Sequence, residues 1–138
     1  MDNIQVQNIK IELIKINAVK IIPEREKQDR EDKDPIDIEP EKENMNSVNI
    51  TFKQSEKNQN IDFHVIYTIP LTSKKKISLD AEFNGTIVLS SDIDLDEVFS
   101  NDDKKWFHTN IVSNILKAVD HKLGPIFNSM DIDYKKLS

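Results

Sequence analysis

An alternating run of residues between positions 77 and 89 constrains the fold of this chain more than any other feature. Its odd positions are all apolar or glycine, and its even positions are almost all polar: Ile77, Leu79, Ala81, Phe83, Gly85, Ile87 and Leu89 alternate with Ser78, Asp80, Glu82, Asn84, Thr86 and Val88. Successive side chains of a strand point to opposite faces, so this run predicts a strand with one covered face and one wet face. Gly85, in mid-strand, indicates a bend or a close approach of another backbone.

Two shorter runs precede this strand and show the same alternation. Their apolar positions are Val48, Ile50 and Phe52 in the first, and Ile61, Phe63, Val65, Tyr67, Ile69 and Leu71 in the second. The connections, a polar turn at 55–60 and a lysine-rich turn at 74–76, are short. Short connections favour antiparallel neighbours, so we expect these three strands to follow one another in one sheet.

The N-terminal residues 4–22 also show a β pattern, but its phase changes. The apolar residues Ile9, Ile11 and Leu13 share one parity, Ile14, Ile16 and Ala18 share the other, and Val19 and Ile21 return to the first. A slip of one residue reverses every side chain, so a strand with this pattern is expected to carry a bulge or a bend. Pro23 ends it, and the charged, proline-containing segment 24–45 is expected to be a long exposed loop.

The last third of the chain predicts one long amphipathic helix over about 103–122. Phe107, Ile111, Ile115, Ala118 and Leu123 recur at helical spacing, and Trp106, Val112, Leu116 and Val119 widen the stripe. Asn101 or Asp102 is the expected N-cap, and Gly124-Pro125 is expected to stop or kink the helix. About twenty residues at about 1.5 Å each give a rod near 30 Å long, enough to cross a sheet.

Composition excludes several classes of function. Two glycines in 138 residues cannot supply a phosphate-binding loop, and the absence of cysteine removes thiol chemistry and disulfides. A formal charge of −6 argues against general nucleic-acid binding. The chain shows no signal peptide pattern and no membrane-spanning apolar run, so we expect a cytoplasmic protein that does not bind membranes.

No pattern in the sequence nominates a catalytic, cofactor or metal site. His64 falls on the polar face of a strand, and His108 and His121 lie too far apart for a one-turn metal pair. Asp92, Asp94, Asp96 and Asp103 have the spacing of calcium-loop ligands, but Glu97 stands where the turn requires glycine and Asp103 where a glutamate is usual. We therefore predict that the chain is not an enzyme and carries no cofactor or metal.

The order of the expected elements resembles the SecB family of tetrameric protein-export chaperones, and in particular its short, divergent members. The segments that carry this resemblance are 14–20 for a first strand, 81–89 for a last strand with its glycine, Asn110-Ile111 with Ile115 and Leu116 for the start of the main helix, and Gly124-Pro125-Ile126 after it. The resemblance covers most of residues 9–130. It implies a single α+β domain over 1–138, with a four-stranded antiparallel sheet, a long crossover after the first strand and one long C-terminal helix.

The resemblance also implies a function, namely holding unfolded polypeptide, as a homo-oligomer built as a dimer of dimers. Two departures limit what can be carried over. The crossover loop 24–45 is charged, where the family has apolar and aromatic residues, and the segment after Met130 is too short for the family's second helix and its SecA-contacting, metal-binding end. Docking to SecA is therefore not expected, whereas general clients or a dedicated partner such as an antitoxin remain open.

Five aromatic residues are the expected client-binding wall, each of which could equally belong to the core: Phe52, Tyr67, Phe83, Trp106 and Phe107. Two other classes of function stay open beside the chaperone. One is an adaptor or structural protein of a phage or mobile element, with an oligomeric interface and no client. The other is a carrier of a hydrophobic small ligand, since a curved sheet around a long helix can enclose a pocket.

Overall fold

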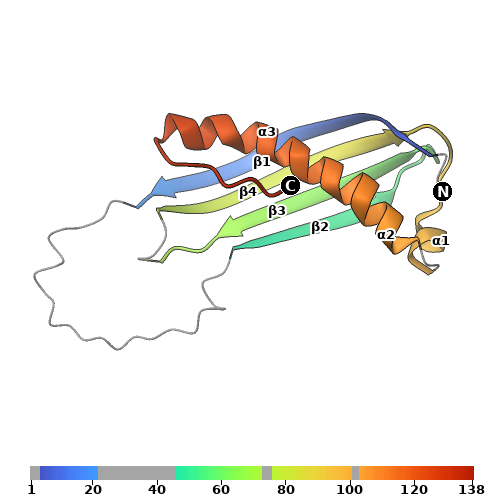
Figure 1. Cartoon of the computed structure of the whole chain (residues 1–138), viewed down its shortest axis with the longest axis horizontal. Coiled ribbons are helices and arrows are strands. Elements are labelled where there is room, and N and C mark those ends of the chain that lie inside the picture. The colour runs from blue at the N-terminus through green and yellow to red at the C-terminus, as the bar shows by residue number, and fades with distance from the viewer. Residues whose placement is uncertain (1–3, 22–45, 73–75, 101–102) are drawn as a thin grey trace, which may run out of the picture.

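Four antiparallel strands and one long helical segment make up the chain in the computed structural model, which describes residues 4–21, 46–72, 76–100 and 103–138 (Figure 1). The strands are β1 (Val6–Lys20), β2 (Ser47–Gln54), β3 (Asn60–Ile69) and β4 (Ile77–Leu89). Their order in the sheet is β1-β4-β3-β2, and every neighbouring pair is antiparallel. The expected α+β class, with four antiparallel strands and a C-terminal helix, is confirmed.

The topology places the first strand beside the last. β2, β3 and β4 follow one another as hairpin neighbours, and β1 pairs with β4 on the far side of the sheet from β2. The connection from β1 to β2 therefore joins opposite edges, which is the long return of a Greek key. The charged loop predicted at 24–45 lies in this connection, outside the described residues, and stays a prediction.

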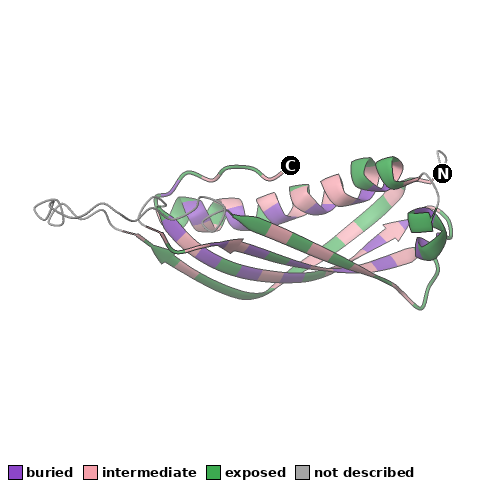
Figure 2. Cartoon of the chain, turned by 90° about the horizontal axis from the view of Figure 1, so that it is seen from below, coloured by how far each residue is buried: buried purple, intermediate pink, exposed green. Residues whose placement is uncertain are grey.

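Alternation along the strands decides which face is covered. All the odd residues predicted to be apolar in β3 and β4 are buried, except Gly85, and they face the helices, as the alternating bands of Figure 2 show. Burial of a Leu, Ile or Phe side chain is worth about 1.5–3 kcal/mol, so this face fixes the register of the two central strands. Leu71, predicted to continue the series, lies beyond β3 and is 72% exposed.

The predicted change of phase in the first strand is a bulge. The register of β1 against β4 shifts between Leu13, opposite Phe83, and Lys15, opposite Glu82. Ile16 and Ala18 then share the helix-facing side with Leu13. The predicted return to the first parity does not occur, because the register continues without a shift to Lys20 and Val19 is 53% exposed.

Gly85 lies where two neighbouring groups come too close for any side chain. A Cβ atom there would stand 2.3 Å from the Lys10 carbonyl oxygen of β1 and 2.3 Å from the ring of Phe63 on β3. The predicted close approach of another backbone is thus confirmed. Because Gly85 has no side chain, the Phe63 ring has room to lie across β4.

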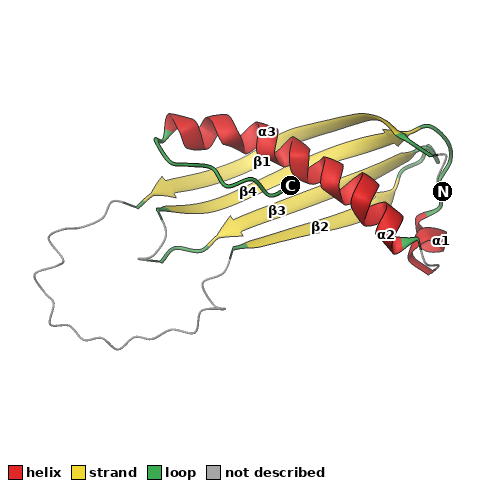
Figure 3. Cartoon of the chain, in the orientation of Figure 1, coloured by secondary structure: helices red, strands yellow, loops and turns green. Residues whose placement is uncertain are grey.

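Helices follow the sheet without a strand between them (Figure 3). A short helix, α1 (Leu95–Ser100), buries Leu95 and Val98 within the acidic segment whose aspartates have the spacing of calcium-loop ligands. The long helix follows as α2 (Lys104–Phe107), a π-helical turn η3 (His108–Val112) and α3 (Ser113–Ser129). The predicted caps Asn101 and Asp102 lie outside the described residues.

Gly124-Pro125 was predicted to stop or kink the helix. The stop is wrong, because α3 continues through Pro125 to Ser129, and the kink stays a prediction. Pro125 lies on the exposed side of the helix, where water can reach the carbonyl group that loses its donor. Leu123 and Phe127, on either side of the proline, are buried against the sheet. Their packing holds the chain helical where the local sequence favours an end.

The covered stripe of the long helix recurs every fourth residue and is formed by Phe107, Ile111, Ile115, Val119, Leu123 and Phe127. Ala118, predicted in this stripe, is only partly buried, and Val119 takes its place. With 3.6 residues per turn, a four-residue spacing drifts by about 40° per step around an α-helix. The stripe therefore winds around the helix and matches a twisted sheet that the helix crosses obliquely, from β2 towards β1 (Figure 1).

Candidate polypeptide-binding surfaces

An oblique helix cannot cover both ends of a sheet face, and this determines where apolar surface remains accessible. The start of the helix lies against β2, where the rings of Phe107 and Phe52 meet edge to face at 4.8 Å. Its later turns lie over β1. Two regions beside the helix are left, one next to the beginning of β1 and the other next to the beginning of β2 and the end of β3.

The first region is a groove beside the helix start, which we call the Trp106 groove. It is a cavity of about 490 Å³ lined by Ile4, Gln5, Val6, Trp106, Asn110 and Asn114. Trp106, Ile4 and Val6 are partly buried and pack against the core, so each keeps an accessible part. The groove combines an aromatic ring, two aliphatic side chains and three amides, which suits a segment of extended polypeptide.

Two of the amide side chains of the Trp106 groove, Asn110 and Asn114, are fixed by the helix itself. Asn110 donates from Nδ2 to the Trp106 carbonyl oxygen at 2.9 Å, and Asn114 donates from Nδ2 to the Asn110 carbonyl oxygen at 2.6 Å. These bonds run along one side of the π-helical turn. Trp106 precedes Phe107 by one residue, which places it about 100° around the helix from Phe107, on the flank of the stripe. The helix thus positions a tryptophan and two amides in a row.

The five aromatic residues predicted as a client-binding wall separate into two groups. Phe83 is 0% exposed, Phe107 3% and Tyr67 4%, so in the single chain their rings lie inside the core. Phe52 and Trp106 are only partly buried. Of the predicted set, these two are the residues whose rings a second molecule can reach, and they lie on opposite sides of the helix start.

Phe99 extends the accessible surface on the Phe52 side and was not among the predicted residues. It is 44% exposed, and its ring meets that of Phe107 at 5.1 Å. The sequence around it is acidic and gives little sign of packing. The apolar pair Leu95 and Val98 at helical spacing is the signal that could have revealed α1, and with it Phe99.

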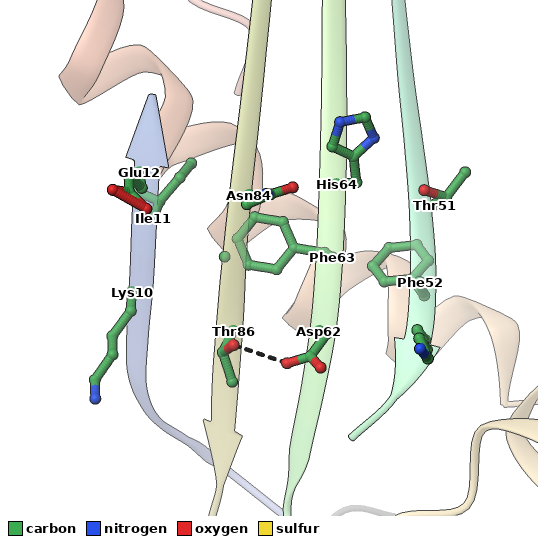
Figure 4. A pocket seen from close by; sticks show the side chains of 12 residues that line it. Lys10, Ile11, Glu12, Thr51, Phe52, Asp62, Phe63, His64, Asn84 and Thr86 are labelled. Carbon is green, nitrogen blue, oxygen red and sulfur yellow. Dashed lines mark hydrogen bonds between the residues drawn. The ribbon is translucent and has the colours of Figure 1, made fainter. Parts of the chain in front are cut away.

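A larger cavity, of about 610 Å³, lies on the opposite face of the sheet, away from the helices (Figure 4). The side chains that point into it come mostly from the wet parity of the strands, with Lys10, Glu12, Asp62, His64 and Thr86 among them. Thr86 donates to Asp62 at 2.8 Å, and Nε2 of His64 lies 2.7 Å from Glu82 Oε2. The predicted place of His64 on the polar face is confirmed. Two pairs of polar groups thus join neighbouring strands, and the side chains of this face are mostly polar and solvent-facing.

The acidic segment that has the spacing of calcium ligands forms a helix start. The Asp94 carboxylate accepts a hydrogen bond from the Asp96 backbone N–H at 3.0 Å, and the Asp94 carbonyl oxygen accepts those of Glu97 and Val98 at 3.1 Å each. Within the described parts of the chain, no three His, Asp or Glu side chains gather closely enough to hold a metal ion. His108 and His121 are both exposed.

The second region beside the helix is filled by the C-terminal residues 130–138, which we call the tail (Figures 1 and 2). The tail turns at Asp131, whose φ of 62° is left-handed, and the Ile132 N–H donates to the Phe127 carbonyl oxygen at 3.0 Å. It then returns beside α3 in an extended form, with Ile132 only 8% exposed and the Tyr134 ring 4.8 Å from that of Phe127.

One carboxylate on the helix, that of Asp120, holds the tail. It accepts hydrogen bonds from the Tyr134 hydroxyl at 2.6 Å, the Leu137 N–H at 2.8 Å, and the Ser138 N–H and hydroxyl at 3.1 and 2.7 Å. Burial alone would raise the pKa of Asp120, but these donors together hold that pKa below its usual range. Burial and the neighbouring Asp120 carboxylate raise the pKa of the Tyr134 hydroxyl.

Comparisons with protein-family models, with curated proteins and with solved structures find no match to this chain. In the described part of the chain, none of the helices has both the length and the apolar character needed to cross a membrane. The function must therefore be argued from the surfaces themselves.

Proposed function

We propose that this chain is a holdase of the SecB kind, a cytoplasmic chaperone without enzymatic activity that binds unfolded polypeptide segments. The order of elements agrees with what the sequence resemblance implies: a long bent strand, a long connection, three hairpin-linked strands and a C-terminal helix. This agreement is in fold and order. The assignment of function depends on the accessible apolar surface.

The observation that carries the proposal is the Trp106 groove. A tryptophan is the side chain with most to gain from burial, and here it lies partly covered at the side of a helix, next to aliphatic side chains and a strand end. Asn110 and Asn114 offer polar groups for the backbone of an extended segment. The groove thus offers a partly exposed aromatic ring among aliphatic and amide groups, which an extended segment can contact through both its side chains and its backbone.

The interior of the molecule disfavours the small-ligand carrier. The side chains between sheet and helix, among them Phe83, Val65, Ile111 and Ile115, are 0% exposed and form one continuous core. The helix packs directly on the sheet, so these side chains fill the space in which an enclosed ligand would lie. The apolar surface that stays accessible beside the helix start, that of Trp106 with Ile4 and Val6, is open to solvent, which favours a polypeptide partner.

The test compares two truncations to alanine, one in the groove and one in the core. Trp106→Ala should weaken binding of an unfolded protein about tenfold, near 1.4 kcal/mol, because the ring is a central apolar contact. It should cost less stability than Leu79→Ala, which creates a cavity and is expected to cost about 2–5 kcal/mol. Binding is measured with a reduced, carboxymethylated protein that cannot refold, and stability by urea unfolding.

The two variants separate the possible results. If Trp106→Ala destabilises the chain as much as Leu79→Ala, Trp106 is a core residue and the groove is not the binding site. If the wild type binds no unfolded protein and does not slow its aggregation, the holdase proposal is wrong. An adaptor or structural protein is then the better interpretation.

A further inference from the structure

The tail of this chain is bound to its body in the manner of a peptide ligand. It is extended, its apolar side chains Ile132 and Leu137 pack against the core, and the Tyr134 ring packs on Phe127. After Ile132, the tail's backbone is hydrogen-bonded to the rest of the described chain only through two N–H groups, those of Leu137 and Ser138, which donate to Asp120. No strand pairing ties it to the sheet, so it can leave without breaking a ladder.

The body contributes a prepared site for these groups, which we call the Asp120 groove. It is lined by Lys117, Asp120, His121, Gly124 and the tail residues Tyr134, Lys136 and Ser138, around a remaining cavity of about 370 Å³. Asp120 receives one aromatic hydroxyl and two backbone N–H groups. Backbone donors are common to every polypeptide, so this carboxylate can bind an extended segment of another sequence in the same way.

The two sides of the oblique helix each leave a gap next to the sheet, and the two gaps differ in whether this chain fills them. On the flank beside β1, the Trp106 groove is open. On the flank beside β3, the same kind of gap between helix and sheet holds the tail, with Tyr67 of β3 close enough to affect Tyr134 electrostatically. Because this gap holds an extended segment of the chain itself, an extended polypeptide segment is the kind of ligand that such a gap can bind.

We propose that the Asp120 groove is a second binding site for extended polypeptide, which residues 131–138 occupy until a client segment displaces them. The inference rests on the proposed holdase function. The favoured client segment has a tyrosine followed after two residues by an apolar side chain, as in Tyr134–Leu137 of the tail. The tail competes with clients, so its own affinity for the groove sets how tightly a client must bind.

The experiment loosens the tail in the full chain and leaves unchanged the residues that the helix contributes to the groove. Tyr134→Ala removes the ring and the hydroxyl of the occupant and leaves Asp120 free to accept. A fluorescent peptide with the sequence of residues 131–138 should bind this variant about tenfold more tightly than it binds the wild type, since its competitor is weakened. Adding Asp120→Ala to Tyr134→Ala should abolish that gain. A peptide with phenylalanine for its tyrosine should bind more weakly.

A second measurement fixes the tail in place and does not depend on weakening it. The chain has no cysteine, so Lys117→Cys with Lys136→Cys offers the only thiols for a reducible bifunctional crosslinker. Both positions line the Asp120 groove. The crosslinked chain should lose binding of the peptide, and reduction should restore it. The same double variant before crosslinking is the matched control.

The outcomes distinguish this inference from the proposed function. If unfolded protein binds the wild type and Trp106→Ala weakens it, but neither Tyr134→Ala nor the crosslink changes peptide or protein binding, the Asp120 groove is not a client site and the holdase proposal stands. If the peptide binds Tyr134→Ala but unfolded protein gains nothing, the groove accepts only its own tail and the inference is wrong. If no variant binds unfolded protein, both proposals are wrong.

Discussion

Two glycines in this chain have opposite structural roles, and substitutions at both test the packing directly. Gly85→Ala should destabilise the protein, because the new methyl group meets the Lys10 carbonyl oxygen and the Phe63 ring at distances no Cβ atom tolerates. Gly124→Ala should stabilise it by about 0.5–1 kcal/mol, since glycine is a poor helix former and nothing lies within 4 Å of the added carbon.

Urea unfolding of the two variants beside the wild type measures both effects. The prediction depends on strand β4 lying against β1 and Phe63 as described. Equal stability of Gly85→Ala and the wild type would mean that the Phe63 ring does not cross β4. A loss of stability in Gly124→Ala would mean that the helix does not run through this position.

Asp120 makes docking of the tail dependent on pH. The folded pKa of this carboxylate lies below its unfolded value of about 3.9, so its contribution is complete above that pH and is lost as pH falls towards the folded pKa. Tyr134 sets the alkaline limit, because its pKa is raised and its contribution is lost as pH rises above about 10. Docking should therefore be constant at neutral pH and fall on both sides.

A solvent-sensitive dye on Lys136→Cys follows tail docking across this range. Asp120→Asn is the control, since an amide does not titrate and the acid transition should disappear with it. Tyr134→Phe should remove the alkaline transition in the same way. An acid transition that persists unchanged in Asp120→Asn would show that another group controls the tail.

At the level of elements, the sequence predicts the structural features that depend only on the pattern of buried residues along one strand or helix. The four strands, the bulge after Leu13 and the close approach at Gly85 all follow from the parity of apolar residues. The helix end could not be predicted, because Pro125 breaks a helix by local rules and only packing of Phe127 on a distant sheet overrides them. The short helix α1 was missed since its two buried residues lie among acidic ones.

The candidate sites were less predictable than the fold. Trp106 was expected at the side of the stripe, and it lies there. The burial of Phe83 and Tyr67 depends on where the helix crosses, which parity alone does not give. The Asp120 contacts join residues fourteen to eighteen positions apart through a reversal at Asp131, and no periodic signal in the sequence marks that reversal.

At the scale of the whole molecule, the exposed apolar residues of β1 predict self-association. Ile14 is 45% exposed, Ile16 36% and Val19 53%, and they lie on an edge strand whose outer side pairs with no strand among the residues that the structure describes. Such an edge is costly to leave open and is usually covered. We expect a homo-oligomer, most simply a dimer of dimers, as the SecB resemblance implies.

Light scattering at several concentrations measures this directly. A mass of about four times 16.0 kDa is expected, and Val19→Lys should shift it to smaller species by placing a charge in the contact. A mass of 16.0 kDa at every concentration would show that the β1 edge stays uncovered in solution.

Binding of unfolded polypeptide in the Trp106 groove has a direct reporter, because the chain has one tryptophan. An unfolded polypeptide that itself lacks tryptophan is titrated into the protein while the emission of Trp106 is recorded. If the segment binds over the partly exposed ring, water leaves it, and the emission should shift to shorter wavelength and saturate at the binding stoichiometry. If such a polypeptide binds, as shown by its own label, while the emission of Trp106 stays unchanged, clients bind elsewhere and the assignment of the groove is contradicted.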